Sequence, residues 1–118
     1  MQIEQLKKII DFLEKKEGKI PKEKGNLNLH SFKKLTSLPK GLKVGGILSL
    51  MFADIESLPE GLKVGGNLSL SESNIESLPE GLEVGGDLYI ENTELEGYID
   101  EEIREMIKPG FIKGKIVR

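Results

Sequence analysis

The chain has 118 residues, of which 31% are charged and 37% hydrophobic, and its formal net charge at pH 7 is −3. This length predicts a single domain, 1–118, that buries about 65% of the surface of its unfolded chain. The absence of cysteine excludes disulfides, the single histidine argues against a zinc site, and no apolar run is long enough to span a membrane.

The charge is divided unevenly along the chain. Residues 1–46 hold 11 lysines and 5 acidic residues, a sum of +6, whereas residues 47–107 hold 15 acidic and 2 basic residues, a sum of −13. Residues 108–118 add +4. Such a gradient can orient a partner or a second copy by electrostatic steering, although undirected drift of surface charge between repeats gives the same pattern.

Residues 1–18 are predicted to form an N-terminal cap helix. Lys15 and Lys16 fall in its last turn, and Gly18 is a stop signal. Its apolar residues recur at helical spacing: Ile3, Leu6, Ile9, Ile10, Phe12 and Leu13. The alternative is an amphipathic helix on a membrane surface, which the four acidic residues between positions 4 and 17 disfavour.

The middle of the chain, 26–96, is built from repeats. The pattern Leu-Pro-x-Gly-Leu-x-Val-Gly-Gly begins at Leu38, Leu58 and Leu78, a spacing of 20 residues without insertion. A fixed short period predicts a small unit stacked on copies of itself, here a β-solenoid of about four turns. Solenoids usually present a binding surface rather than a catalytic pocket.

Each repeat is expected to supply one strand to a single parallel sheet. Two apolar residues alternate with polar ones at Leu27/Leu29, Leu48/Leu50, Leu68/Leu70 and Leu88/Ile90. The Leu-Pro pairs predict an extended turn outside this sheet. The Gly-Gly pairs predict a corner that needs either positive φ or a close backbone approach. One extra residue in the first repeat predicts a bulge near 31–33.

Segment 97–118 is predicted to cap the other end with a short helix and a strand. Asp100 is a good N-cap, and Pro109-Gly110 would end the helical segment. The residues expected to face the last repeat are Ile99, Ile103, Met106 and Ile107. After Gly110, apolar and polar residues alternate, as in a closing strand or an extended tail.

The residues from Leu68 to Pro79, in the pattern Leu-x-Leu-x-x-small-x-Ile-x-x-Leu-Pro, resemble the shortest bacterial form of the leucine-rich repeat. Repeats of type III secreted bacterial effectors also carry Leu-Pro after the strand, but Ala53, Ser73 and Thr93 replace the asparagine of that family. The chain is more similar to Leu-Pro-x-x-Leu-x-Val-Gly-Gly repeat proteins of bacteria and their phages. The resemblance spans 26–96. It implies a leucine-rich-repeat type of fold and, with no secretory signal peptide, a cytoplasmic location in a bacterium or infected host cell.

With the strand register of a leucine-rich repeat, three rows of residues would form an exposed sheet face. They are Asn28, Ser49, Ser69 and Tyr89; His30, Met51, Ser71 and Glu91; and Phe32, Phe52, Glu72 and Asn92. Clustered aromatic and methionine side chains on a surface mark interaction sites. The candidate binding residues are His30, Phe32, Ser49, Met51, Phe52, Ser69 and Tyr89. Alternatively, Phe32 and Phe52 turn inward and fill the core.

No residue set predicts catalysis, a cofactor or a metal site. His30 has no nucleophile or acid placed to work with it, and paired carboxylates such as Glu101 and Glu102 are better explained as solvated. The Gly-Leu-Lys-Val-Gly-Gly segments lack the Gly-Lys-Ser/Thr ending of a phosphate loop. Nucleic-acid binding is not predicted, because acidic residues interrupt the lysines and arginine is absent before Arg104.

We therefore expect a non-enzymatic protein-binding module whose partner docks on the sheet face or on the basic first repeat. Inhibition of a host or defence protein by a phage or bacterial protein is one form of this hypothesis. The alternative is a structural repeat protein that associates with itself through its charge gradient.

Overall fold

The computed structural model of the protein describes residues 22–23, 25–29 and 38–118. Its strands are two residues long, and they form two parallel sheets of five strands each. The predicted cap helix at 1–18 and the predicted bulge near 31–33 lie outside the described residues.

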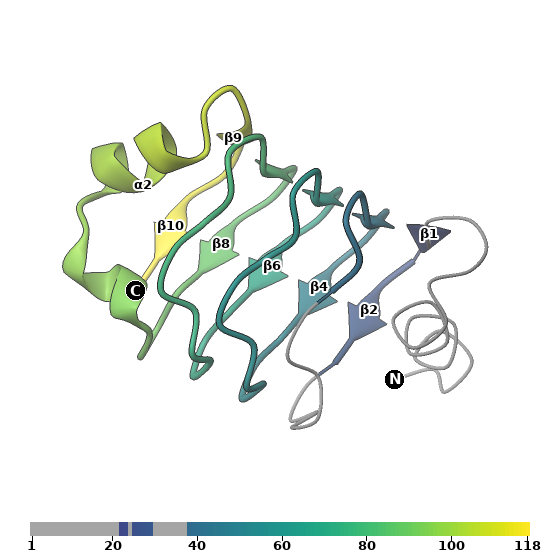
Figure 1. Ribbon diagram of the computed structural model, residues 1–118, viewed down its shortest axis with the longest axis horizontal. Helices are drawn as coiled ribbons and strands as arrows, with labels where there is room; N and C mark the ends of the chain where they lie inside the picture. The colour runs from purple at the N-terminus through teal and green to yellow at the C-terminus, as the bar shows by residue number, and fades with distance from the viewer. Residues whose placement is uncertain (1–21, 24, 30–37) are drawn as a thin grey trace.

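We call the two sheets A and B. Sheet A contains, in spatial order, β1 (Lys22–Glu23), β3 (Lys43–Val44), β5 (Lys63–Val64), β7 (Glu83–Val84) and β9 (Phe111–Ile112). Sheet B contains β2 (Leu27–Asn28), β4 (Leu48–Ser49), β6 (Leu68–Ser69), β8 (Leu88–Tyr89) and β10 (Ile116–Val117). Figure 1 shows the strands of sheet B side by side along the long axis of the molecule.

The prediction of one sheet is wrong, because each repeat supplies a strand to both sheets. The segment Leu62-Lys63-Val64 alternates apolar and polar residues just as Leu68-Ser69-Leu70 does, and its centre forms β5. The Gly-Gly pair lies between these two segments, so it joins a strand of sheet A to the next strand of sheet B. We number the repeats one to four by their sheet B strands β2, β4, β6 and β8.

Strand pairing follows the sequence repeat. Leu48 pairs with Leu68, and Leu68 pairs with Leu88, each 20 positions apart. Leu27 pairs with Leu48 at a distance of 21 positions, while β1 and β2 keep the spacing of later strands. The extra residue of repeat one therefore lies between Asn28 and Lys43.

The Gly-Gly corners owe their composition to close backbone contact. A Cβ placed on Gly65 would lie 2.3 Å from the carbonyl oxygen of Gly45, and one on Gly85 would lie 2.2 Å from that of Gly65. Positive φ occurs instead at the glycine after each Leu-Pro-x, with values of 75° at Gly41, 77° at Gly61 and 84° at Gly81. Of the two reasons predicted for the corner glycines, close approach is the one that the structure confirms.

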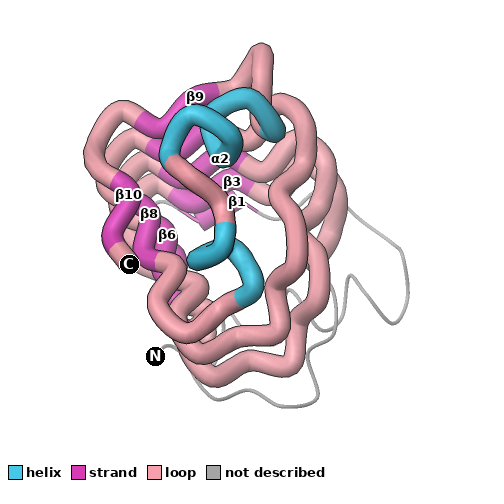
Figure 2. The backbone as a smooth tube through the Cα atoms, turned by 90° about the vertical axis from the view of Figure 1, so that its left-hand side faces the viewer, coloured by secondary structure: helices cyan, strands magenta, loops and turns pink. Residues whose placement is uncertain are grey.

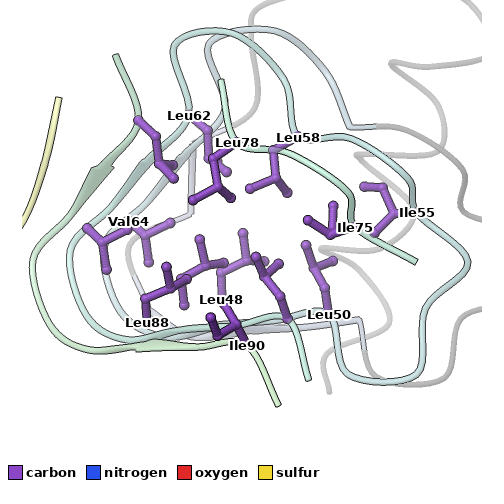
Figure 3. Close-up of a cluster of buried hydrophobic side chains, with 14 of the residues drawn as sticks. Leu48, Leu50, Ile55, Leu58, Leu62, Val64, Ile75, Leu78, Leu88 and Ile90 are labelled. Atoms are coloured by element: carbon purple, nitrogen blue, oxygen red, sulfur yellow. The ribbon is translucent and has the colours of Figure 1, made fainter. Parts of the chain in front are cut away.

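The core is a set of apolar side chains that point inward from both sheets and from the connecting loops. Figure 3 shows Leu48, Leu50, Leu88 and Ile90 from the sheet B side opposite Leu58, Leu62 and Leu78, with Ile55 and Ile75 at one end. All of these residues are buried. Leu38, Leu58 and Leu78 lie in loops outside both sheets, as their following prolines predict.

After repeat four the chain forms the 3-10 helix η1 (Glu94–Gly97) and helix α2 (Asp100–Met106), then returns to the sheets as β9 and β10. The predicted closing strand is thus present, once in each sheet. Figure 2 shows η1 and α2 lying across the outline that the repeats trace, at the C-terminal end.

Two expectations for α2 need correction. Ile103 and Ile107 are buried and Met106 packs against the core, but Ile99 is 60% exposed. Ile99 is also the N-cap residue, a position we expected for Asp100, and its N–H donates to Glu102 Oε1 at 3.0 Å. Ile99 therefore caps the helix through its backbone N–H, and its side chain lies outside the core.

Candidate binding surface on sheet B

The outer face of sheet B carries the row of residues expected from the sequence. Strand register aligns Asn28, Ser49, Ser69 and Tyr89, and continues to Val117. Ser49, Ser69 and Tyr89 are half-buried, whereas the leucines and the isoleucine on either side of them are fully buried. The side chains of this row therefore point outward from sheet B, and the row itself runs across the strands.

The second predicted row is only partly exposed. Met51 is half-buried and Glu91 is exposed, but Ser71 is buried, and its Oγ donates to Glu91 Oε1 at 3.4 Å. Ser71 thus belongs to a contact between repeats rather than to an open surface.

Phe52 is the second residue of the turn after β4, and its side chain is 42% exposed. The structure thus decides between the two alternatives for this residue in favour of the outward one. Its backbone has φ 61°, and the equivalent Glu72 and Asn92 have φ 61° and 54°. Asparagine adopts this left-handed conformation routinely, but a bulky residue such as phenylalanine does so at an energetic cost.

Ile47 is a surface residue that sequence reasoning missed. It is 41% exposed and stands directly before the sheet B strand, where repeats one, three and four have Asn26, Asn67 and Asp87. Those three side chains each accept a backbone N–H of the next repeat, from Ile47 at 2.8 Å, Asp87 at 2.8 Å and Lys115 at 2.9 Å. The side chain of Ile47 has no atom that could accept the N–H of Asn67, so this ladder of hydrogen bonds is interrupted between repeats two and three.

Repeat two therefore departs from the other repeats at both ends of β4. We call Ile47, Met51 and Phe52 the repeat-two patch. The turn that follows is also different, because Ser73 and Thr93 donate their hydroxyls to Leu70 O at 2.5 Å and Ile90 O at 2.7 Å. Ala53 is the equivalent residue of repeat two, and it has no hydroxyl to make this bond, as the sequence predicts. Acidic and polar side chains adjoin the patch on the side of repeats three and four, where Asn92 Nδ2 donates to Glu72 Oε1.

The other predicted site residues are not all gathered here. His30 and Phe32 lie outside the described residues. Tyr89 belongs to the same face but is two repeats away from Met51. The predicted site residues that the structure brings together are thus Met51 and Phe52, with a row of small or polar residues beside them.

The outer face of sheet A has a different character. A groove of about 550 Å³ runs over Gly45, Gly65 and Gly85, and long side chains line it, namely Lys43, Lys63, Glu83, Phe111 and Lys113. Lys63 Nζ lies 3.4 Å from Glu83 Oε2, and Lys113 Nζ lies 5.6 Å from the centre of the Phe111 ring. This face carries more positive than negative side chains, unlike the acidic border of the repeat-two patch.

Within the described ranges, no three His, Asp or Glu side chains are grouped in a way that could hold a metal ion. The helices described there are all too short or too polar to cross a membrane. Family models, curated proteins and solved structures were each compared with this chain, and none of them matches it.

Proposed function

We propose that the protein is a non-enzymatic binding module on a leucine-rich-repeat type of β-solenoid. Its protein partner docks on the outer face of sheet B, with the repeat-two patch at the centre of the contact. The 20-residue spacing from repeat two to repeat four and the continuous parallel pairing in both sheets support the solenoid interpretation.

The observation that carries this proposal is the exchange of stabilising residue types for exposed apolar ones at both ends of β4. Ile47 stands where an asparagine would bond the next repeat, and Phe52 stands where an asparagine would tolerate the left-handed backbone. Each exchange leaves an apolar side chain more than 40% exposed, and each is expected to lower the free energy of unfolding. Such costs concentrate at functional sites, and exposed apolar clusters with polar rims are typical of protein interfaces.

The border of the patch indicates the chemistry of the partner. Glu72 is exposed and occupies in repeat three the position that Phe52 has in repeat two. Glu91 of repeat four is also exposed, and its carbonyl accepts the N–H of Glu72. A partner that inserts an apolar side chain at Met51 and Phe52 and carries lysine or arginine beside it would match both features. Inhibition of a host protein in the cytoplasm of a bacterium or an infected cell is the form of this function that the repeat resemblance favours.

Capture of a partner by wild-type and substituted protein tests the proposal. M51A/F52A removes the apolar groups of the patch, while S57A/E60A makes two substitutions at exposed loop residues of the same repeat, outside both sheets. Both proteins and the wild type would be immobilised, exposed to bacterial lysate, and compared by quantitative mass spectrometry. We expect a protein that wild type and S57A/E60A retain and M51A/F52A loses, with unchanged melting temperatures. Equal retention by all three, or a large loss of stability in M51A/F52A, would contradict the proposal.

Self-association is the second candidate function, and the sheet A groove favours it. Lys43, Lys63 and Lys113 could receive the acidic loops of a second copy, which include Glu56 and Glu76. Light scattering at low and high salt distinguishes this candidate, because a charge-driven assembly dissociates as salt rises. A monomer at both salt concentrations would rule it out.

A further inference from the structure

The groove on sheet A carries an excess of positive charge. Three lysines and one glutamate line it, and Lys63 is paired with Glu83 at 3.4 Å. Lys43 and Lys113 are exposed, and neither belongs to an ion pair in the described part of the chain. The groove therefore has a net charge of +2, from three positive side chains and one negative.

An excess of negative charge lies at the opposite end of the same cross-section. Figure 3 shows Val64 of β5 at one end of the core and Ile55 and Ile75 at the other. An exposed glutamate follows each isoleucine, and a third exposed glutamate, from η1, lines the same depression. In the part of the chain that the structure describes, none of the three is in an ion pair. We call these residues the acidic rim: Glu56, Glu76 and Glu94.

The lysines of the groove and the glutamates of the rim recur with the same rise. Lys43 pairs in register with Lys63 on the neighbouring strand, which places the two about 4.8 Å apart along the stack of repeats. Glu76 N donates to Glu56 O at 3.4 Å, so these glutamates also belong to adjacent turns of the backbone. An extended peptide spaces the side chains of one face at about 6.6 Å, since each residue rises about 3.3 Å. A second copy of this chain therefore matches the lysines step for step, whereas an extended acidic peptide does not.

We infer that the sheet A groove of one copy receives the acidic rim of a second copy, with the two stacks of repeats lying side by side. This inference rests on the self-association candidate and specifies its contact. Because the groove and the rim lie at opposite ends of the cross-section, each copy in a pair keeps one of the two surfaces available for a further neighbour. The contact is heterologous, and it leads to an open-ended row of copies rather than to a symmetric dimer.

Reversal of charge on either side of the contact tests the inference in the full chain. K43E/K113E changes the groove from three positive and one negative side chain to the reverse, and it leaves the Lys63–Glu83 pair intact. E56K/E76K reverses two of the three charges of the rim. All four positions are exposed, so circular dichroism should show that both variants are folded. In sedimentation velocity at low salt, each should self-associate at least about tenfold more weakly than wild type, because like charges then face each other.

The combination of all four substitutions is the matched control. K43E/K113E/E56K/E76K keeps the net charge of wild type, −3, because the two losses of positive charge balance the two losses of negative charge. It exchanges the signs of the two surfaces, and it should therefore self-associate as wild type does. If a reversed variant is unfolded, K43Q/K113Q and E56Q/E76Q remove the same charges without reversing them, and each should also weaken association.

The possible failures point to different conclusions. Wild-type association that no folded double variant weakens would overturn this contact and leave self-association in place. A folded quadruple variant that stays dissociated would also overturn it, because the losses in the double variants would then not come from pairing of these two surfaces. A wild type that is monomeric at low salt would overturn both this contact and the self-association candidate. Capture of a partner by the repeat-two patch is a separate measurement, so its failure is distinguished from all of these.

Discussion

Contacts between neighbouring repeats explain the residue types at the corners of this protein. Gly65 and Gly85 lie directly against the carbonyl of the corner glycine in the repeat before them. Gly86 gives room to the Asn67 side chain, whose Oδ1 would lie 2.2 Å from a Cβ at that position, and that same oxygen accepts the N–H of Asp87. Glycine and asparagine thus work as a pair, the first making space for the second.

Substitution of a corner glycine should destabilise the fold. G65A places a methyl group 2.3 Å from the Gly45 carbonyl oxygen, and we expect it to lower the free energy of unfolding by about 1–3 kcal/mol, as overpacking does. A Cβ at Gly97 would meet no atom within 4 Å, so G97A should stay within about 0.5 kcal/mol of wild type. Urea denaturation of both variants checks this, and an equal effect of the two would contradict the account of the corner.

Substitution of the two unusual residues of repeat two, Ile47 and Phe52, should raise the free energy of unfolding. I47N supplies the missing acceptor for the Asn67 N–H and should add about 0.5–1.5 kcal/mol to the free energy of unfolding. F52N places at the left-handed position the residue type that repeat four has there, and should add about 0.5–1 kcal/mol. The exposed loop residue Ser57 provides the control, because S57N adds an asparagine outside both positions and should change stability little. A loss of stability in I47N or F52N would show that these side chains are part of the packing.

At the scale of the elements, strands of two residues hold the molecule together through repetition. Each strand pairs in register with its copy in the next repeat, and the apolar residues beside it form continuous rows in the core. The last turn is longer, because Glu83 pairs with Phe111, 28 positions later, and the inserted residues include α2. This helix covers the end of the core, where a further repeat would otherwise be needed.

Packing of α2 on the core gives a prediction for this element. I103A removes most of a fully buried side chain and should lower the free energy of unfolding by about 2–4 kcal/mol. I99A truncates a side chain that is 60% exposed, so its effect should stay below about 0.5 kcal/mol. Thermal denaturation distinguishes the two, and comparable losses would mean that Ile99 packs on the core after all.

The sequence predicts the repeated strands, the inward leucines and the extended Leu-Pro turns, because these follow from a spacing that never varies between Leu38 and Gly86. It does not reveal the second sheet, since Leu62-Lys63-Val64 stands between two turn signals, Pro59-Glu60-Gly61 and Gly65-Gly66, and is therefore interpreted as part of a turn. Strands β9 and β10 are recognised only as an alternating tail. The insertion of α2 breaks the period, and Phe111 differs in type from Glu83, the residue with which it pairs. Ile47 is missed for a different reason. The role of its position as a hydrogen-bond acceptor becomes visible only in the contacts of Asn26 and Asn67.

At the scale of the whole molecule, the residues that are identical between repeats and the residues that vary lie in different places. The identical parts of the repeats form the core and the corners, whereas the outer face of sheet B changes from apolar at Ile47, Met51 and Phe52 to acidic at Glu72 and Glu91. The outer face of sheet A carries Lys43 and Lys63 on its strands and Lys113 directly after β9. A protein built in this way can present different chemistry on two faces without altering its fold.

The most direct test of the central claim is binding of the captured partner to the I47N/F52N variant, measured together with its stability. If the repeat-two patch exists for binding, this variant is more stable than wild type and its affinity falls by at least about tenfold, corresponding to about 1.4 kcal/mol or more. The gain in stability excludes unfolding as the cause of the loss. An affinity equal to that of wild type in a folded, stabilised variant would contradict the claim that the patch is the binding site.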